Sequence, residues 1–66
     1  MEQHIRLNWP QLVEEAVKRR KQQHLTQEEM AVLAGVSKPT LNGFEQGKTT
    51  ITLRSVLKIL KALGLE

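Results

Sequence analysis

Apolar and polar positions follow a helical period along most of the chain. The first such pattern predicts a helix over residues 9–22. Asn8 is a suitable N-cap, and Pro10 fits a first helical turn because its missing N–H needs no partner there. Four residues share one face of this helix at the spacing i, i+3, i+4 and i+7: Val13, Ala16, Val17 and Arg20.

Two short helices are predicted next. The first opens with a capping box, in which Thr26 caps the N–H of Glu29 and Glu29 reaches back to the N–H of Thr26. It ends before Gly35, a residue that adopts a left-handed conformation at little cost. The second covers about residues 38–46, between the N-cap Ser37 and the next glycine. A turn of about three residues therefore separates the two helices.

The last helix has the strongest pattern. Thr52 caps it and Gly64 stops it. The residues expected to face the core are Leu53, Val56, Leu57, Leu60 and Leu63. Because no strand pattern or repeat is visible after residue 8, the sequence predicts an all-α, four-helix fold.

The chain divides into an arm and one domain. Residues 1–8 are predicted to be an N-terminal arm, in which Ile5 and Leu7 weakly favour a short strand, and residues 9–66 a single domain. With no cysteine, neither a disulfide nor a zinc knuckle can hold the domain together. The N-terminal sequence lacks the apolar region of a signal peptide, and lysines interrupt the C-terminal apolar stretch, so we expect a cytoplasmic protein without a membrane span.

Charge and helix spacing together indicate the partner. The chain carries 10 Lys and Arg residues against 7 Asp and Glu residues, a net charge of +3, which favours an anionic partner. Two short helices joined by a tight, glycine-containing turn cross at a large angle, and the second can then enter the major groove of DNA. This organisation predicts a helix-turn-helix DNA-binding domain.

Residues 25–63 resemble the Cro/C1-type (lambda-repressor-like, Xre) helix-turn-helix family. The resemblance rests on the capping-box segment, on the turn at residues 34–37, on the segment from Phe44 to Lys48 and on the leucine-rich end. Within that family the chain looks closest to HipB-type antitoxins. The resemblance implies a four-helix, lambda-repressor-like fold and a double-stranded DNA ligand.

The resemblance also implies roles for individual residues. The positions that match base-reading residues are Ser37, Lys38, Pro39, Asn42 and Gly43. The positions that match phosphate contacts are Gln27, Thr40, Gln46 and Lys48. Since neither Pro39 nor Gly43 has a side chain that can hydrogen-bond a base edge, direct readout is expected from Lys38 and Asn42, with DNA shape adding specificity.

Two further expectations concern the local structure at Arg20 and His24. Arg20 lies on the apolar face of the first helix, and the resemblance implies an ion pair between it and Glu45. His24 stands where relatives commonly have glycine, so we expect a left-handed conformation there.

Neither His24 nor His4 has acidic or cysteine companions at ligand spacing, so we expect no metal and no other cofactor. Nothing in the sequence indicates an enzyme.

The sequence thus predicts a transcriptional repressor that binds a pseudo-palindromic operator as a homodimer. Its expected role is to autoregulate its own operon as the antitoxin of a toxin protein. A phage Cro-like repressor, a restriction-modification controller and a protein-interaction module without DNA binding remain alternatives. Ile59, which lies off the leucine stripe, is expected with Leu63 and Leu65 in the dimer interface, and the arm with Ile5 and Leu7 is the competing surface.

Overall fold

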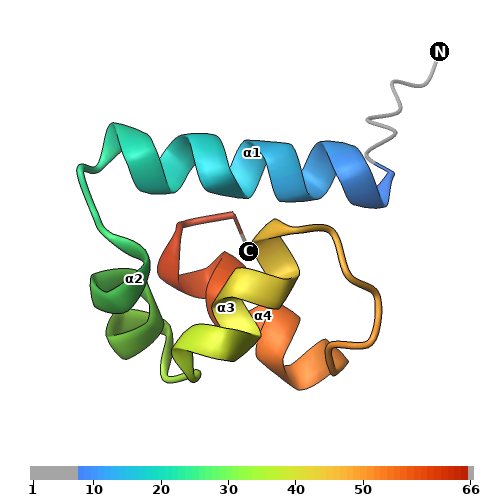
Figure 1. Ribbon diagram of the computed structural model, residues 1–66. Helices are drawn as coiled ribbons and strands as arrows, with labels where there is room; N and C mark the ends of the chain where they lie inside the picture. The colour runs from blue at the N-terminus through green and yellow to red at the C-terminus, as the bar shows by residue number, and fades with distance from the viewer. Residues whose placement is uncertain (1–7, 66) are drawn as a thin grey trace, which may run out of the picture.

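The computed structural model describes residues 8–65, and this part of the chain folds into four helices and no strand. The helices are α1 (Trp9–Gln22), α2 (Gln27–Ala34), α3 (Lys38–Glu45) and α4 (Leu53–Ala62). The long α1 lies across the shorter α2, α3 and α4 (Figure 1). The all-α fold expected from the sequence is confirmed. A strand at Ile5 and Leu7 lies outside the described residues.

The helix starts follow from local capping. The side chains of Asn8, Thr26, Ser37 and Thr52 each accept a hydrogen bond from a backbone N–H in the first turn of α1, α2, α3 and α4 respectively. Both Asn8 and Thr26 form complete capping boxes. Each cap satisfies a donor that the helix itself leaves unpaired, so local chemistry is sufficient to place these boundaries.

His24 ends α1 in the conformation expected from the sequence. Its φ is +58°, and among the described residues it alone has a positive φ without being glycine. The N–H of Leu25 then donates to the carbonyl of Arg20 at 3.2 Å, which closes the helix end. Histidine occupies this region with strain, because its Cβ crowds the following carbonyl.

The core sits where the four helices meet. Its largest fully buried side chains are Phe44, Met30, Leu41 and Ile59. The helix α2 packs on both α3 and α4, and α1 packs on α3. The helix α3 therefore contacts all three other helices, α1, α2 and α4, which fixes the direction in which its outer face points.

The rotation of α4 about its axis differs from the prediction. The buried residues of α4 are Val56, Ile59 and Leu60, followed by its C-cap Leu63, whereas Leu53 is 71% exposed and Leu57 is 39% exposed. Two stripes with helical spacing overlap in this leucine-rich sequence and share Val56, Leu60 and Leu63. Packing against α2 and α3 selects the stripe that contains Ile59.

This rotation corrects the dimer interface predicted from the sequence. Ile59 has an exposed fraction of 0% and Leu63 one of 3%, so both side chains lie in the core and neither is available to a second subunit. Leu65 is partly buried and packs against the same core, since its N–H donates to the carbonyl of Leu60 at 2.8 Å and turns the chain back. The large apolar residues exposed on α4 are instead Leu53 and Leu57.

Candidate nucleic-acid interface

The turn between α2 and α3 is fixed by backbone bonds and one apolar contact. Gly35 has a φ of +75°, and the N–H of Val36 donates to the carbonyl of Ala31 at 3.0 Å. Val36 itself is partly buried against the core, as expected for a side chain between two crossing helices. The turn therefore sets the angle at which α3 leaves α2, which is the geometry of a helix-turn-helix unit.

Ser37 and Thr40 are engaged with each other at the start of α3. The Ser37 hydroxyl accepts from the backbone N–H of Thr40 at 3.2 Å and donates to the Thr40 hydroxyl at 2.8 Å. Both hydroxyls thus stabilise the first turn of the helix. The family resemblance implies base reading by Ser37 and phosphate contact by Thr40, and both roles stay predictions.

Four of the expected DNA-contacting residues line one shallow depression between the N-terminal ends of α2 and α3. They are Gln27, Lys38, Pro39 and Asn42, and we call this depression the α2–α3 hollow. Lys38 and Pro39 are exposed, whereas Gln27 and Asn42 are half-buried. Residues that lie up to 15 positions apart in the chain thus present their side chains to one surface.

Lys38 has an acidic neighbour at the edge of this hollow. Its ammonium nitrogen lies 3.6 Å from a carboxylate oxygen of Glu28, and both side chains are more than half exposed. An exposed pair of this kind contributes at most about 1 kcal/mol and exchanges readily for other partners. Lys38 is therefore free to leave Glu28 for an anionic or base acceptor.

Lys48, which follows the end of α3, lies beside Gly43. The N–H of Lys48 donates to the carbonyl of Gly43 at 3.0 Å, and Gly47 supplies the left-handed residue, with a φ of +83°, that this helix end requires. A Cβ at Gly43 would stand 3.7 Å from the Lys48 Cδ. The Lys48 side chain thus passes over α3 at Gly43, at a distance that would still allow ordinary van der Waals contact with a Cβ there.

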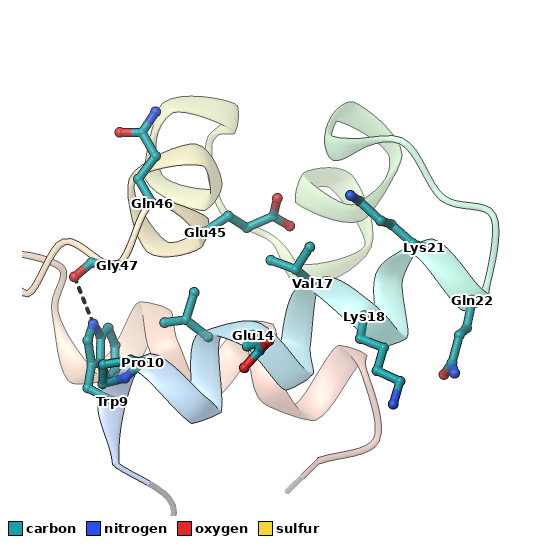
Figure 2. Close-up of a pocket in the computed structure, with 11 residues that line it drawn as sticks. Trp9, Pro10, Glu14, Val17, Lys18, Lys21, Gln22, Glu45, Gln46 and Gly47 are labelled. Carbon is teal, nitrogen blue, oxygen red and sulfur yellow. Dashed lines mark hydrogen bonds between the residues drawn. The ribbon is translucent and has the colours of Figure 1, made fainter.

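Trp9 of α1 contacts the turn at Gly47 that follows α3. An open groove runs between α1 and the end of α3, and Trp9 stands in its lining (Figure 2). Its indole N–H donates to the Gly47 carbonyl at 2.9 Å, and its ring meets Phe44 edge-on at 5.6 Å. Because Gly47 directly precedes Lys48, this contact positions a predicted phosphate-binding residue. The sequence reasoning missed this role, since no local pattern links residues 38 positions apart.

The ion pair expected between α1 and α3 is present. The guanidinium of Arg20 donates to both carboxylate oxygens of Glu45, at 2.7 and 3.1 Å, and to the carbonyl of Leu25 at 2.7 Å. The side chains are only 12% and 8% exposed. In Figure 2 the Glu45 carboxylate points toward Val17 of α1 and away from Gln46, which faces outward.

Gln27 joins this ion pair to the α2–α3 hollow, which the sequence did not predict. Its amide nitrogen donates to a Glu45 carboxylate oxygen at 2.8 Å and lies 3.4 Å from the amide oxygen of Asn42. The NH₂ group of Gln27 therefore has a short hydrogen bond to Glu45 and a longer contact to Asn42, both inside the protein. A phosphate contact by Gln27, as expected from the sequence, would have to use its backbone N–H or break these bonds.

Neither a membrane-spanning helix nor a metal-binding cluster is found among the described residues. No helix among residues 8–65 is long and apolar enough to cross a membrane. The same residues contain no group of three or more His, Asp or Glu side chains that could hold a metal ion.

Comparison with known proteins identifies the class to which this fold and site belong. A family model described as "Helix-turn-helix" matches residues 18–66, and the chain belongs to that family, of the Cro/C1 type. The chain is a helix-turn-helix DNA-binding domain, and its class is that of DNA-binding regulatory proteins.

Two solved structures contain a chain that is similar to this protein. One is titled "Structure of HipA-HipB-O2-O3 complex" and the other "MDT Protein". In each, the matching chain is 32% identical to this one, with a TM-score of 0.81 over 98% of this chain and 90% of that chain. The HipB-type resemblance seen in the sequence is thus confirmed. No curated protein sequence matches the chain.

Proposed function

We propose that this protein is a sequence-specific repressor that binds a pseudo-palindromic operator in duplex DNA and autoregulates its own operon as an antitoxin. The observation that carries the proposal is the α2–α3 hollow, which gathers Lys38 and Asn42 at the exposed start of the recognition helix. A lysine and an asparagine are side chains suited to hydrogen-bonding base edges in the major groove. Such a protein would work in the cytoplasm, where its DNA is.

Base reading is tested on the promoter DNA of the protein's own operon. Lys38→Ala and Asn42→Ala should each weaken binding to the cognate site by about 1–3 kcal/mol and weaken binding to random DNA far less. Lys61→Ala is the matched control, because Lys61 is an exposed lysine near the end of α4, away from the hollow. Equal losses on cognate and random DNA would show that the hollow does not specify sequence.

Backbone contacts are proposed for Lys48 and Gln46, which are exposed at the end of α3. Replacing Lys48 with alanine should weaken binding to all sequences alike and reduce the salt dependence by about one unit of slope, because one fewer counterion is released. An unchanged slope in a salt titration would remove Lys48 from the set of phosphate contacts. Thr40 belongs to the same proposal.

We propose a homodimer, because two copies on a two-fold site discriminate better than one module of this size. With Ile59 and Leu63 in the core, the apolar surface that α4 offers is formed by Leu53 and Leu57, one helical turn apart. Leu57→Lys should yield a monomer in sedimentation equilibrium, whereas Val32→Lys, at an 80% exposed site on α2, should not. If only Ile5→Lys dissociates the protein, the N-terminal arm is the interface.

The toxin partner is proposed from similarity to the chain in the HipA–HipB–O2–O3 complex. The test is co-expression with the protein encoded beside this one in its genome. An antitoxin should restore growth that the neighbour alone suppresses, and it should co-purify with the neighbour. Growth that is unaffected by the neighbour would refute the antitoxin role and leave a regulator of another system.

A further inference from the structure

The strongest unassigned feature is a chain of polar contacts that runs from the buried ion pair to the hollow. Arg20 of α1 holds the Glu45 carboxylate, Gln27 of α2 donates to that carboxylate at 2.8 Å, and Asn42 of α3 faces Gln27 at 3.4 Å. These contacts thus connect the Glu45 side chain, which is 8% exposed, to the Asn42 side chain at the proposed DNA surface.

The charge at the buried end decides which way each amide points. A carboxylate only accepts hydrogen bonds, so Gln27 must turn its NH₂ group, and not its oxygen, toward Glu45. The same NH₂ group then faces Asn42, whose oxygen Oδ1 must be the atom that accepts from it. Within residues 8–65 the Asn42 nitrogen Nδ2 donates to no protein atom, so its two N–H groups remain available at the hollow.

We propose, building on the proposed function, that Glu45 is a positioning residue that acts through Gln27 to fix the amide of Asn42 with its donors toward DNA. The bidentate asparagine contact to adenine needs both an outward oxygen and an outward NH₂ group. Here the oxygen is turned toward Gln27, and only donors face outward. Asn42 is therefore set to read guanine, which presents two acceptors, N7 and O6, in the major groove.

The test uses two variants at Gln27 with side chains of similar length. Gln27→Met removes both donors, whereas Gln27→Lys keeps donors and has no acceptor, so it can still face Glu45 and the Asn42 oxygen. Binding is measured on a library of operator duplexes, and Asn42→Ala identifies the base pair that Asn42 reads. Thermal melting of each variant checks that the fold is retained.

The unmodified protein should prefer guanine at that base pair. Gln27→Met should reduce this preference about fivefold or more and leave preferences at other base pairs intact, since coupled side chains commonly interact by 0.5–3 kcal/mol. Gln27→Lys should retain the guanine preference even if added charge raises affinity for all sequences. A residue with a merely structural role would not change the preference at one base pair alone.

A second measurement examines the contacts without DNA. In NMR spectra of the free protein, the side-chain amide protons of Gln27 should exchange with solvent more slowly than those of Gln46, an exposed glutamine at the end of α3. Exchange at equal rates would overturn the proposal.

The DNA results separate this proposal from the proposed function. Sequence-specific binding in which Gln27→Met keeps the guanine preference, or in which Asn42 reads adenine, would overturn the positioning role alone. A uniform loss of affinity in Gln27→Met, together with a smaller salt slope, would also overturn it and assign Gln27 to phosphate. Absence of any sequence preference in the unmodified protein would instead refute the proposed function.

Discussion

Breaking the Arg20–Glu45 pair from one side should bring this domain close to unfolding. Arg20→Met keeps the aliphatic stem against the core but leaves the Glu45 carboxylate with only Gln27 as a partner. The side chains are 12% and 8% exposed, so the remaining charge gains little from water. Removal of one partner from a buried pair costs about 3–5 kcal/mol.

The cost is large relative to the whole stability of the chain. At about 0.05–0.15 kcal/mol per residue, 66 residues give a free energy of unfolding of about 3–10 kcal/mol.

The adjacent Arg19 provides a matched control, because it pairs with Glu15 at 3.2 Å in the same helix, with both side chains about 40% exposed. Arg19→Met should cost no more than about 0.5 kcal/mol, as is usual for exposed pairs of this spacing.

Urea denaturation followed by circular dichroism measures each free energy of unfolding by linear extrapolation. The double variant Arg20→Met with Glu45→Met completes the cycle, and it should be more stable than the sum of the single effects predicts, because no unpaired charge stays buried. Single effects that simply add, or an Arg20→Met effect as small as that of Arg19→Met, would refute the reasoning.

Three other substitutions test local features. His24→Gly should raise the free energy of unfolding by about 1 kcal/mol, because the φ of +58° is strained for histidine, and a lowered melting temperature would contradict this. Gly43→Ala should add about 0.5–1 kcal/mol of stability, since its Cβ has room, yet weaken operator binding; unchanged binding would remove Gly43 from the DNA surface. Thr26→Ala should cost about 1 kcal/mol in thermal melts, while Thr49→Ala in the exposed loop should cost almost none, and equal effects would exclude the cap.

Local sequence chemistry was sufficient for the helix boundaries and for much of the site. A cap, a left-handed glycine or a capping box involves residues only a few positions apart, so these signals can be read directly along the chain. Together with the family resemblance, they identified Lys38, Asn42 and Gln27 as surface candidates, and these line one hollow. The position of Arg20 on an apolar face gave a reason to look for a partner, and Glu45 provides it.

Only tertiary packing decided the rest. The sequence of α4 supports two overlapping apolar stripes, and contact with α2 and α3 places Ile59 inside and Leu57 outside. The bonds from Gln27 to Glu45 and Asn42 likewise depend on how three helices meet, because the partners lie 15 and 18 positions away. Helical periodicity fixes which residues share a face, but the direction in which that face points is set by the helices packed against it.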